Sequence, residues 1–200
     1  MNIDFSKDLI LQNKFSLLRP LCKDDFHSLL KFSIEELELW KYSLVSGAGE
    51  ENLMNYIELA LKDRIEQRSY PFLVIDQASN EVAGSTRFYD YQSAHNTVQL
   101  GFTWYGKKFQ GTGLNKNCKL LMLTHAFEVW YLDRVEFRAD SNNLRSVAAM
   151  KSIGCVSEGV LRSNCQALTG RRDSVILSIL KNEWFDSVKE NLHAKINYRN

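Results

Sequence analysis

The sequence predicts a single domain of mixed α/β class. Three β-branched and aromatic runs, at residues 71–76, 82–91 and 97–104, follow one another across short polar turns, which favours an antiparallel meander. Strand-like and helix-like segments then alternate down the chain, a pattern typical of α/β folds. With two prolines and ten glycines in 200 residues, no linker-like stretch divides the chain, so we expect one domain over residues 1–200.

The remaining elements are predicted from local patterns. The polar pair Asn13-Lys14 separates two short strands, at residues 8–12 and 15–19, and predicts a hairpin. Apolar residues at helical spacing predict a helix over residues 50–67, after a shorter helix that ends near Ser33. Downstream we expect helices at 111–130, 143–153 and 183–196, and strands at 134–139, 155–162 and 173–180.

The composition excludes several function classes. Charged residues make up 24% of the chain and the formal net charge is +1, so no global field attracts nucleic acid or a membrane surface. No signal-peptide core and no run of about 18 apolar residues is present, which predicts a soluble, cytoplasmic protein. The four cysteines and four histidines show no zinc-ligand spacing, so we expect free thiols and no metal.

A glycine-containing loop before a helix is the most informative segment. Gly111 and Gly113 follow a strand and precede an amphipathic helix, whose N-terminal N–H groups and dipole suit a pyrophosphate. A P-loop requires Lys-Ser/Thr where Leu114-Asn115 stands, and a dinucleotide fingerprint requires Gly or Ala where Lys116 stands. A coenzyme A loop fits best.

Several further motifs together resemble the GNAT acetyltransferase superfamily, in its RimJ/RimL-like branch of ribosomal-protein N-acetyltransferases. The resemblance covers about residues 17–180 and leaves 181–200 as a C-terminal helical tail. Lys108 stands where the family usually has Arg or Gln, and Cys155 where an aromatic residue is common. The motifs are Lys108-Phe109-Gln110-Gly111-Thr112-Gly113, Asn143-Leu144-Arg145-Ser146, Ile153-Gly154-Cys155, Glu158-Gly159, the Thr169-Gly170-Arg171-Arg172-Asp173 turn, Leu18-Arg19-Pro20-Leu21 and Val82-Ala83-Gly84.

The resemblance implies a fold, a cosubstrate and a coenzyme site. The fold would be a mixed, mostly antiparallel central sheet flanked by helices, and the cosubstrate acetyl-CoA. The pantetheine arm would pair with the strand near residues 100–104, where it separates from the strand that begins near Arg134. The implied coenzyme-binding residues are Phe102, Trp104, Lys108, Phe109, Gln110, Gly111, Thr112, Gly113, Leu114, Asn143 and Ser146.

The resemblance also suggests catalytic roles. The backbone N–H near Phe102 would stabilise the developing oxyanion, and Ser146 would protonate the leaving thiolate. Asn143 would cap its helix and touch the pantetheine, and Ser146 has the alternative reading of a first-turn residue that only caps or packs. The general base stays open among Tyr89, Asp90, Tyr91, Glu158 and an ordered water, while His125 reads as a core histidine.

The acceptor region is the least readable part of the chain. Trp40 and Tyr42 could line an acceptor pocket or simply pack. A group of glutamates could attract a cationic amine or form a solvated helix face. These are Glu35, Glu36, Glu38, Glu50 and Glu51.

These observations favour an acetyl-CoA-dependent N-acetyltransferase, monomeric or homodimeric, in which an amine attacks directly in a ternary complex. An α-amine of a protein or peptide N-terminus is the expected acceptor, because its pKa of ~8 leaves more neutral amine at pH 7 than the ~10.4 of lysine. Two alternatives stay open. One is an acetyltransferase acting on a small molecule (polyamine, amino acid or antibiotic), and the other is a module that binds acyl-CoA without turning it over.

Overall fold

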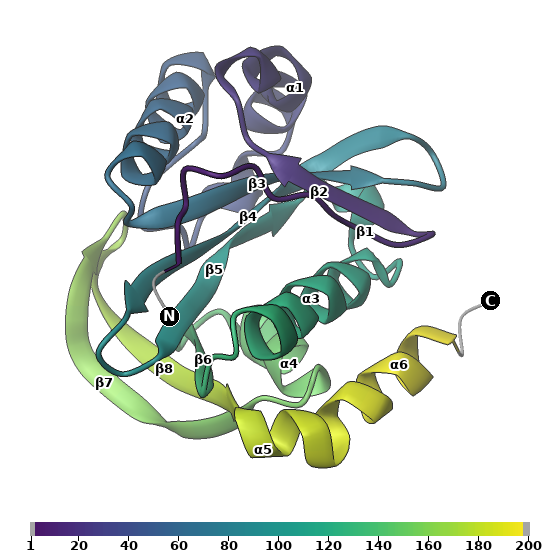
Figure 1. Ribbon diagram of the computed structural model, residues 1–200. Helices are drawn as coiled ribbons and strands as arrows, with labels where there is room; N and C mark the ends of the chain where they lie inside the picture. Colours follow the sequence, from purple (N-terminus) through teal and green to yellow (C-terminus); the bar gives the residue numbers. More distant parts are fainter. Residues whose placement is uncertain (1–2, 198–200) are drawn as a thin grey trace.

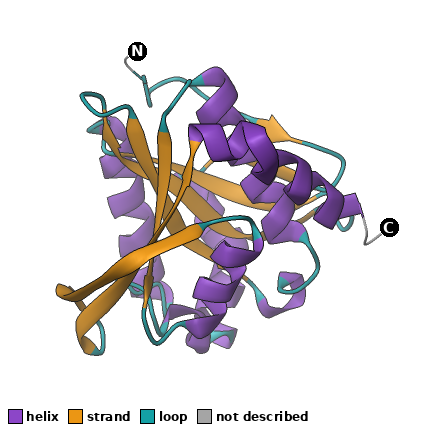
Figure 2. Cartoon of the chain, turned by 90° about the horizontal axis from the view of Figure 1, so that it is seen from below, coloured by secondary structure: helices purple, strands orange, loops and turns teal. Residues whose placement is uncertain are grey.

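The computed structural model, which describes residues 3–197, shows one sheet covered by helices on both faces (Figure 1). Helices α1 (Phe26–Glu35) and α2 (Glu50–Ile65) cover one face. Helices α3 (Leu114–Thr124) and α4 (Leu144–Ser152) lie on the other, with the C-terminal helices α5 (Lys181–Glu183) and α6 (Lys189–Asn197) (Figures 1 and 2). This arrangement confirms the predicted mixed α/β single domain.

The sheet has eight strands in the order β1-β2-β3-β4-β5-β6-β8-β7, and only the β5–β6 pair is parallel. The hairpin across Asn13-Lys14 and the three-stranded meander, now β3 to β5, are both confirmed. A mostly antiparallel sheet is also what the family resemblance implied. The strands are β1 (Leu11–Gln12), β2 (Ser16–Pro20), β3 (Ser69–Asp76), β4 (Glu81–Gln92), β5 (Thr97–Tyr105), β6 (Arg134–Asp140), β7 (Val156–Ala167) and β8 (Gly170–Leu180).

Two predicted boundaries differ from the structure. The helix expected from residue 111 begins at Leu114, because Gly111 and Gly113 adopt left-handed φ angles that end any continuous helical path, and after Thr124 it continues as a π-helical turn to Val129. The strand expected to end at residue 162 extends to Ala167. A ladder irregularity between Leu161 and Cys165 carries the chain through its polar residues, and in Figure 2 this hairpin projects past the body of the molecule.

An aromatic cluster joins α1 and α2 to the sheet. Trp40 is 1% exposed and its ring lies 4.8 Å from that of Trp104 on β5, while Trp104 Nε1 donates to the Tyr56 hydroxyl at 3.3 Å. Trp40 therefore packs in the core, and of the two readings left open for it the packing one holds. This cluster fixes α2 over β5, which determines the shape of the site described below.

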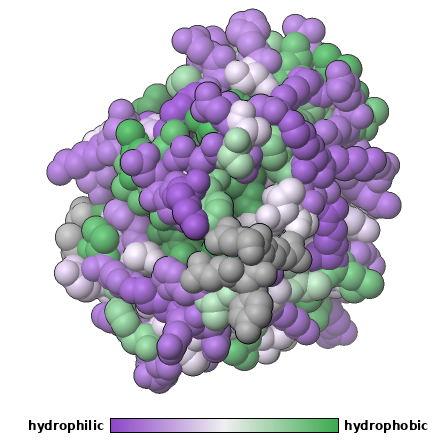
Figure 3. All heavy atoms as spheres, turned by 90° about the vertical axis from the view of Figure 1, so that its right-hand side faces the viewer, coloured by the Kyte–Doolittle hydropathy of each residue, from purple (hydrophilic) through white to green (hydrophobic). Residues whose placement is uncertain are grey.

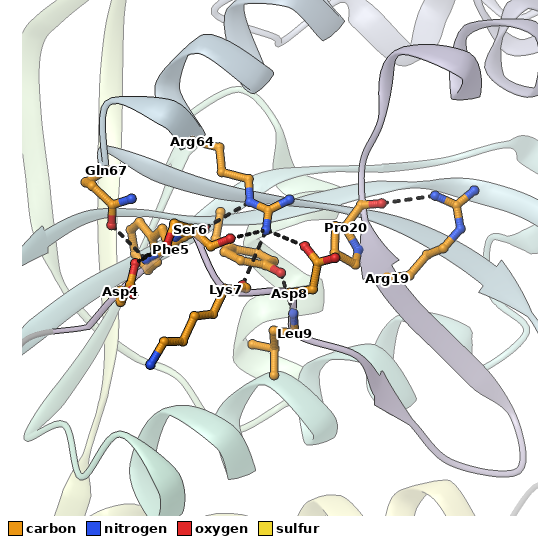
Figure 4. A network of polar contacts seen from close by, with 11 residues as sticks. Asp4, Phe5, Ser6, Lys7, Asp8, Leu9, Arg19, Pro20, Arg64 and Gln67 are labelled. Carbon is orange, nitrogen blue, oxygen red and sulfur yellow. Dashed lines mark hydrogen bonds and ion pairs between the residues drawn. The ribbon is translucent and has the colours of Figure 1, made fainter.

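The segment before β1 is tied down by an arginine of α2 (Figure 4). Arg64 Nε donates to the Phe5 carbonyl at 2.9 Å, and its Nη2 reaches the Ser6 and Lys7 carbonyls and Asp8. The guanidinium also stacks over the Tyr70 ring at 4.6 Å. All its polar contacts are thus with the chain itself. Among residues 3–197, no helix is long and apolar enough to cross a membrane.

Candidate active site

The loop before α3 leaves open space on its outer side. Gly111 and Gly113 have φ angles of +76° and +93°, and a Cβ placed at either would have no heavy atom within 4 Å. The loop is braced from within, since Gln110 Nε2 donates to the Tyr105 carbonyl at 2.6 Å and Thr112 Oγ1 donates to the Phe109 carbonyl at 2.8 Å. A rigid loop with free space over its glycines fits a diphosphate group approaching the backbone.

The N-terminus of α3 continues this site. Leu114 begins the helix and is buried, which anchors the first turn while its N–H groups, without partners inside the helix, face outward. The helix dipole adds positive potential at the same point. Lys108 is exposed and its Nζ lies 2.6 Å from Glu81, so its ammonium is engaged outside the loop. These residues fit the pyrophosphate of coenzyme A, as the sequence predicts.

Strands β5 and β6 diverge next to this loop. Their parallel ladder joins only Thr97–Gln99 to residues 134–136, and β5 then continues to Tyr105 without further pairing to β6. At Phe102 the backbone takes a left-handed φ of +48°, and the β4–β5 register shifts around it. This bulge turns the local backbone away from regular pairing. The predicted oxyanion donor therefore lies at a distorted part of the strand, beside the gap between β5 and β6.

A buried lysine supports the bulge from the α3 side. Lys119 is 4% exposed, and its Nζ lies 2.8 Å from the Thr103 hydroxyl and 3.1 Å from that of Thr86. Burial lowers the pKa of Lys119 to about 7. The side chain links α3 to both strands at the bulge, a connection that the sequence analysis did not anticipate.

The start of α4 is organised as expected for a capped helix. Asn143 accepts a hydrogen bond from the Ser146 backbone N–H at 3.0 Å, which confirms the capping role of Asn143. Ser146 is half-buried in the first turn. Its role as an acid and the contact of Asn143 with pantetheine stay predictions.

A cavity of about 360 Å³ lies on the α2 side of the bulge. Three of the four candidates for the base, Tyr89, Asp90 and Tyr91, line it together with Phe102. Burial raises the pKa of Tyr89 to about 12, so its phenol stays protonated at neutral pH. The complete lining is Asp63, Gln67, Arg68, Ser69, Arg87, Tyr89, Asp90, Tyr91, Gln92 and Phe102.

Glu158, the fourth candidate, does not line this cavity. Both of its carboxylate oxygens accept hydrogen bonds from Arg134, and Ser178 donates to one of them. These bonds lower the pKa of Glu158 to about 2, which makes the carboxylate a poor base. We assign Glu158 to the ion-pair network of β6 to β8.

The remaining candidates lie elsewhere. None of the five glutamates lines the cavity, and Glu36 accepts a hydrogen bond from the Lys107 N–H at 2.7 Å. His125 lies beside Trp130 and lines a larger cavity of about 620 Å³ between β1, α3 and α6, whose lining includes no residue of the glycine loop. Burial lowers the pKa of His125 to about 4. Figure 3 shows this side of the molecule, with hydrophobic surface in the middle of a largely hydrophilic face.

Sequence reasoning missed three charged residues of the site, Arg87, Asp63 and Lys119. Each lies in an element predicted correctly, on β4, α2 and α3. The alternation of side chains along β4 was the available signal, because a charged residue within a strand as buried as this one requires a partner or a function.

Comparison with known proteins agrees with the geometry. The family described as "Acetyltransferase (GNAT) domain" matches residues 16–156 of the chain. The chain therefore belongs to the GNAT acetyltransferase family, and acetyl-CoA is the acetyl donor that this family uses. Within residues 3–197, no cluster of three or more histidine, cysteine or acidic side chains is arranged to hold a metal ion.

Individual relatives extend this result. The chain is 29% identical over 103 residues to a Bacillus subtilis (strain 168) protein named "Putative ribosomal N-acetyltransferase YdaF", and the match covers 52% of this chain and 56% of that protein. It is 32% identical to an acetyltransferase of known structure from T. thermophilus, with a TM-score of 0.83 over 93% of this chain and 96% of the other. Mycobacterium smegmatis RimJ in complex with CoA-disulfide shares the fold at 19% identity, with a TM-score of 0.76 over 94% and 93% of the two chains.

Proposed function

We propose that this protein transfers the acetyl group of acetyl-CoA to an α-amine, at the N-terminus of a protein or peptide. The observation that carries the proposal is the position of the Phe102 bulge. It borders the gap between β5 and β6 and also the 360 Å³ cavity under α2. A thioester beside the bulge would be reachable by an amine that enters the cavity.

The residues divide the chemistry in a simple way. The glycine loop and the first turn of α3 would hold the diphosphate, and Phe102 would offer its N–H to the carbonyl oxygen as charge develops. Ser146, on the helix next to the gap, would return a proton to the thiolate. No nucleophile of the protein is required, because the amine attacks the thioester directly.

The electrostatics of the cavity favour an acceptor that needs little help to lose its proton. Asp63 is paired with Arg68, and Asp90 accepts hydrogen bonds from Gln92 and Gln99, both at 2.6 Å. With Tyr89 protonated, none of these is a strong base. An α-amine has a pKa ~2.4 units below that of lysine, a deprotonation advantage of ~3.3 kcal/mol. The relative named as a ribosomal N-acetyltransferase supports the same choice.

A competition experiment tests the acceptor. A peptide with a free N-terminus and no lysine competes with its N-blocked, lysine-containing twin for limiting enzyme and acetyl-CoA, and mass spectrometry measures both products. We expect the free N-terminus to be acetylated at least ~10-fold faster. Faster acetylation of the blocked peptide contradicts the proposal. Release of no thiol with any amine, despite tight binding of acetyl-CoA, would instead support the acyl-CoA-binding module.

A further inference from the structure

Arg87 is a buried arginine without a polar partner. It lies in the middle of β4 and is 3% exposed. Its guanidinium is stacked between two rings, 4.1 Å from the centroid of Phe102 and 5.0 Å from that of Tyr56. Its Nε is buried with no hydrogen-bond partner, and within residues 3–197 neither Nη makes a hydrogen bond or ion pair with the protein. Ring stacking alone compensates poorly for a desolvated charge.

Arg64 shows what a complete set of partners looks like in the same protein (Figure 4). It also stacks on an aromatic ring, but its nitrogens donate to three backbone carbonyls and to Asp8. Arg172, another buried arginine, donates from Nε to Ser174. Arg87 differs from both because its donors are left to the space that it lines.

That space is the acceptor cavity. The other arginine there, Arg68, is paired with Asp63 and with Glu66, so its charge is already balanced. Arg87 and Asp90 then present opposite charges to one cavity. A planar guanidinium with free donors matches a carboxylate, which it can hold through two parallel hydrogen bonds.

We propose that Arg87 determines acceptor specificity by binding a carboxylate that lies close to the reactive amine. The inference rests on the proposed function, because it places the acceptor in the cavity beside Phe102. The Arg87 guanidinium stacks on the Phe102 ring, and the Phe102 backbone is the predicted oxyanion donor. A carboxylate held by Arg87 is therefore only a few bonds from an amine that attacks there. The α-carboxylate of a free amino acid and the side chain of an N-terminal Asp or Glu both satisfy this chemistry.

Matched acceptors test the inference on the intact protein. One pair is a peptide beginning with Glu and its twin beginning with Gln, and the other is free alanine and alaninamide. We expect kcat/KM to be at least ~10-fold higher for the carboxylate member of one pair, since a charged hydrogen bond contributes about a factor of ten or more. The pair that shows the difference identifies the source of the carboxylate.

Variants separate recognition from structure. Arg87→Gln is expected to lower kcat/KM for the carboxylate member ~10–100-fold more than for its amide twin, and Arg87→Lys to fall between. Arg64→Gln is the control, since that residue stacks on a ring but does not line the cavity, and its ratio between twins should equal that of the wild type. A purely structural Arg87 would lower both twins equally, and that result overturns the inference.

A binding measurement keeps the two proposals distinguishable. With coenzyme A present, the carboxylate acceptor should raise the Tm of the wild type more than its amide twin does, and Arg87→Gln should remove this difference. Acetylation of α-amines with no preference between twins upholds the proposed function and overturns the role of Arg87. If lysine peptides alone are acetylated, the proposed function fails, and the Tm comparison still decides for or against Arg87. If Arg87→Gln does not fold, the wild-type comparison of twins decides alone.

Discussion

Two polar residues at the start of α4 have separate tasks. The cap is made by the Asn143 side chain and the backbone N–H of Ser146, at 3.0 Å. The Ser146 hydroxyl takes no part in that bond, so its removal leaves the cap in place. This separation makes Ser146 a clean position at which to test proton donation to the thiolate.

We expect Ser146→Ala to lower kcat by ~10²-fold or more with little change in affinity for acetyl-CoA, since general acid catalysis contributes about 10²–10⁴. Steady-state kinetics and a coenzyme titration measure the two quantities. Ser152→Ala is the control on the same helix, because its hydroxyl donates only to the Ala149 carbonyl at 2.7 Å. Equal losses of binding and rate would assign Ser146 to helix positioning, and no loss would remove it from the mechanism.

At the residue scale, the sequence identified the coenzyme loop better than the acceptor cavity. Gly111 and Gly113 are readable because a left-handed backbone before a helix calls for glycine. The cavity brings Asp63 of α2 together with Arg87 of β4 and Phe102 of β5. No local pattern encodes that meeting, since it depends on how α2 lies over the sheet.

At the scale of elements, strands and helices were predictable wherever side-chain periodicity was strong. The meander and α2 have such patterns, and their boundaries came out within a few residues. The far half of β7 did not, because its residues are almost all exposed and therefore show no alternation of buried and exposed side chains. The bulge at Phe102 was also invisible, because a phenylalanine gives no sign of a left-handed φ.

The glycine loop and α3 form one functional element, and Gly113 joins them. Gly113→Asp would place a side chain and a negative charge where the diphosphate is expected. Acetyl-CoA at 100 times its Kd should stabilise the wild type by ~2.7 kcal/mol, and we expect this variant to lose that stabilisation. Thermal unfolding with and without acetyl-CoA measures the difference.

Gly170→Asp controls for backbone strain. Gly170 also has a positive φ, +113°, with open space around it, but it lies in the turn between β7 and β8. Both variants should lose stability without ligand by ~1 kcal/mol or more. Only Gly113→Asp should lose the response to acetyl-CoA. An unchanged response in a folded Gly113→Asp protein would mean that the diphosphate binds elsewhere.

At the scale of the whole molecule, the sheet separates two tasks and the Phe102 bulge connects them. The glycine loop and α3 lie on one face, and the cavity beneath α2 lies on the other. Lys119 fastens α3 to the strands at the bulge through two threonine hydroxyls. A buried amine at the centre of the molecule also makes its overall stability depend on pH.

The sign of that dependence follows from the lowered pKa. Lys119 titrates at about 7 in the folded protein, because burial disfavours its ammonium form, and at 10.5 when unfolded. Between these values the unfolded chain binds the proton that the folded protein lacks, so the free energy of unfolding rises with pH. The slope contributed by this one group is at most ~1.4 kcal/mol per pH unit. Below pH 7 both states are protonated, and the contribution of Lys119 becomes constant.

Lys119→Met should remove this contribution. Methionine fills the buried space, and the hydroxyls of Thr86 and Thr103, 2.7 Å apart, can still bond to each other. We therefore expect the variant to be the more stable protein near pH 7 and its advantage to shrink towards pH 10. Urea unfolding at each pH unit measures this, and subtracting the two curves cancels groups that titrate alike in both proteins. Lys116→Met, on the same helix but outside the buried core, should follow the wild-type curve. Parallel curves for wild type and Lys119→Met would show that the lysine keeps its charge when buried, and its bonds to the two threonines would then be charge-assisted.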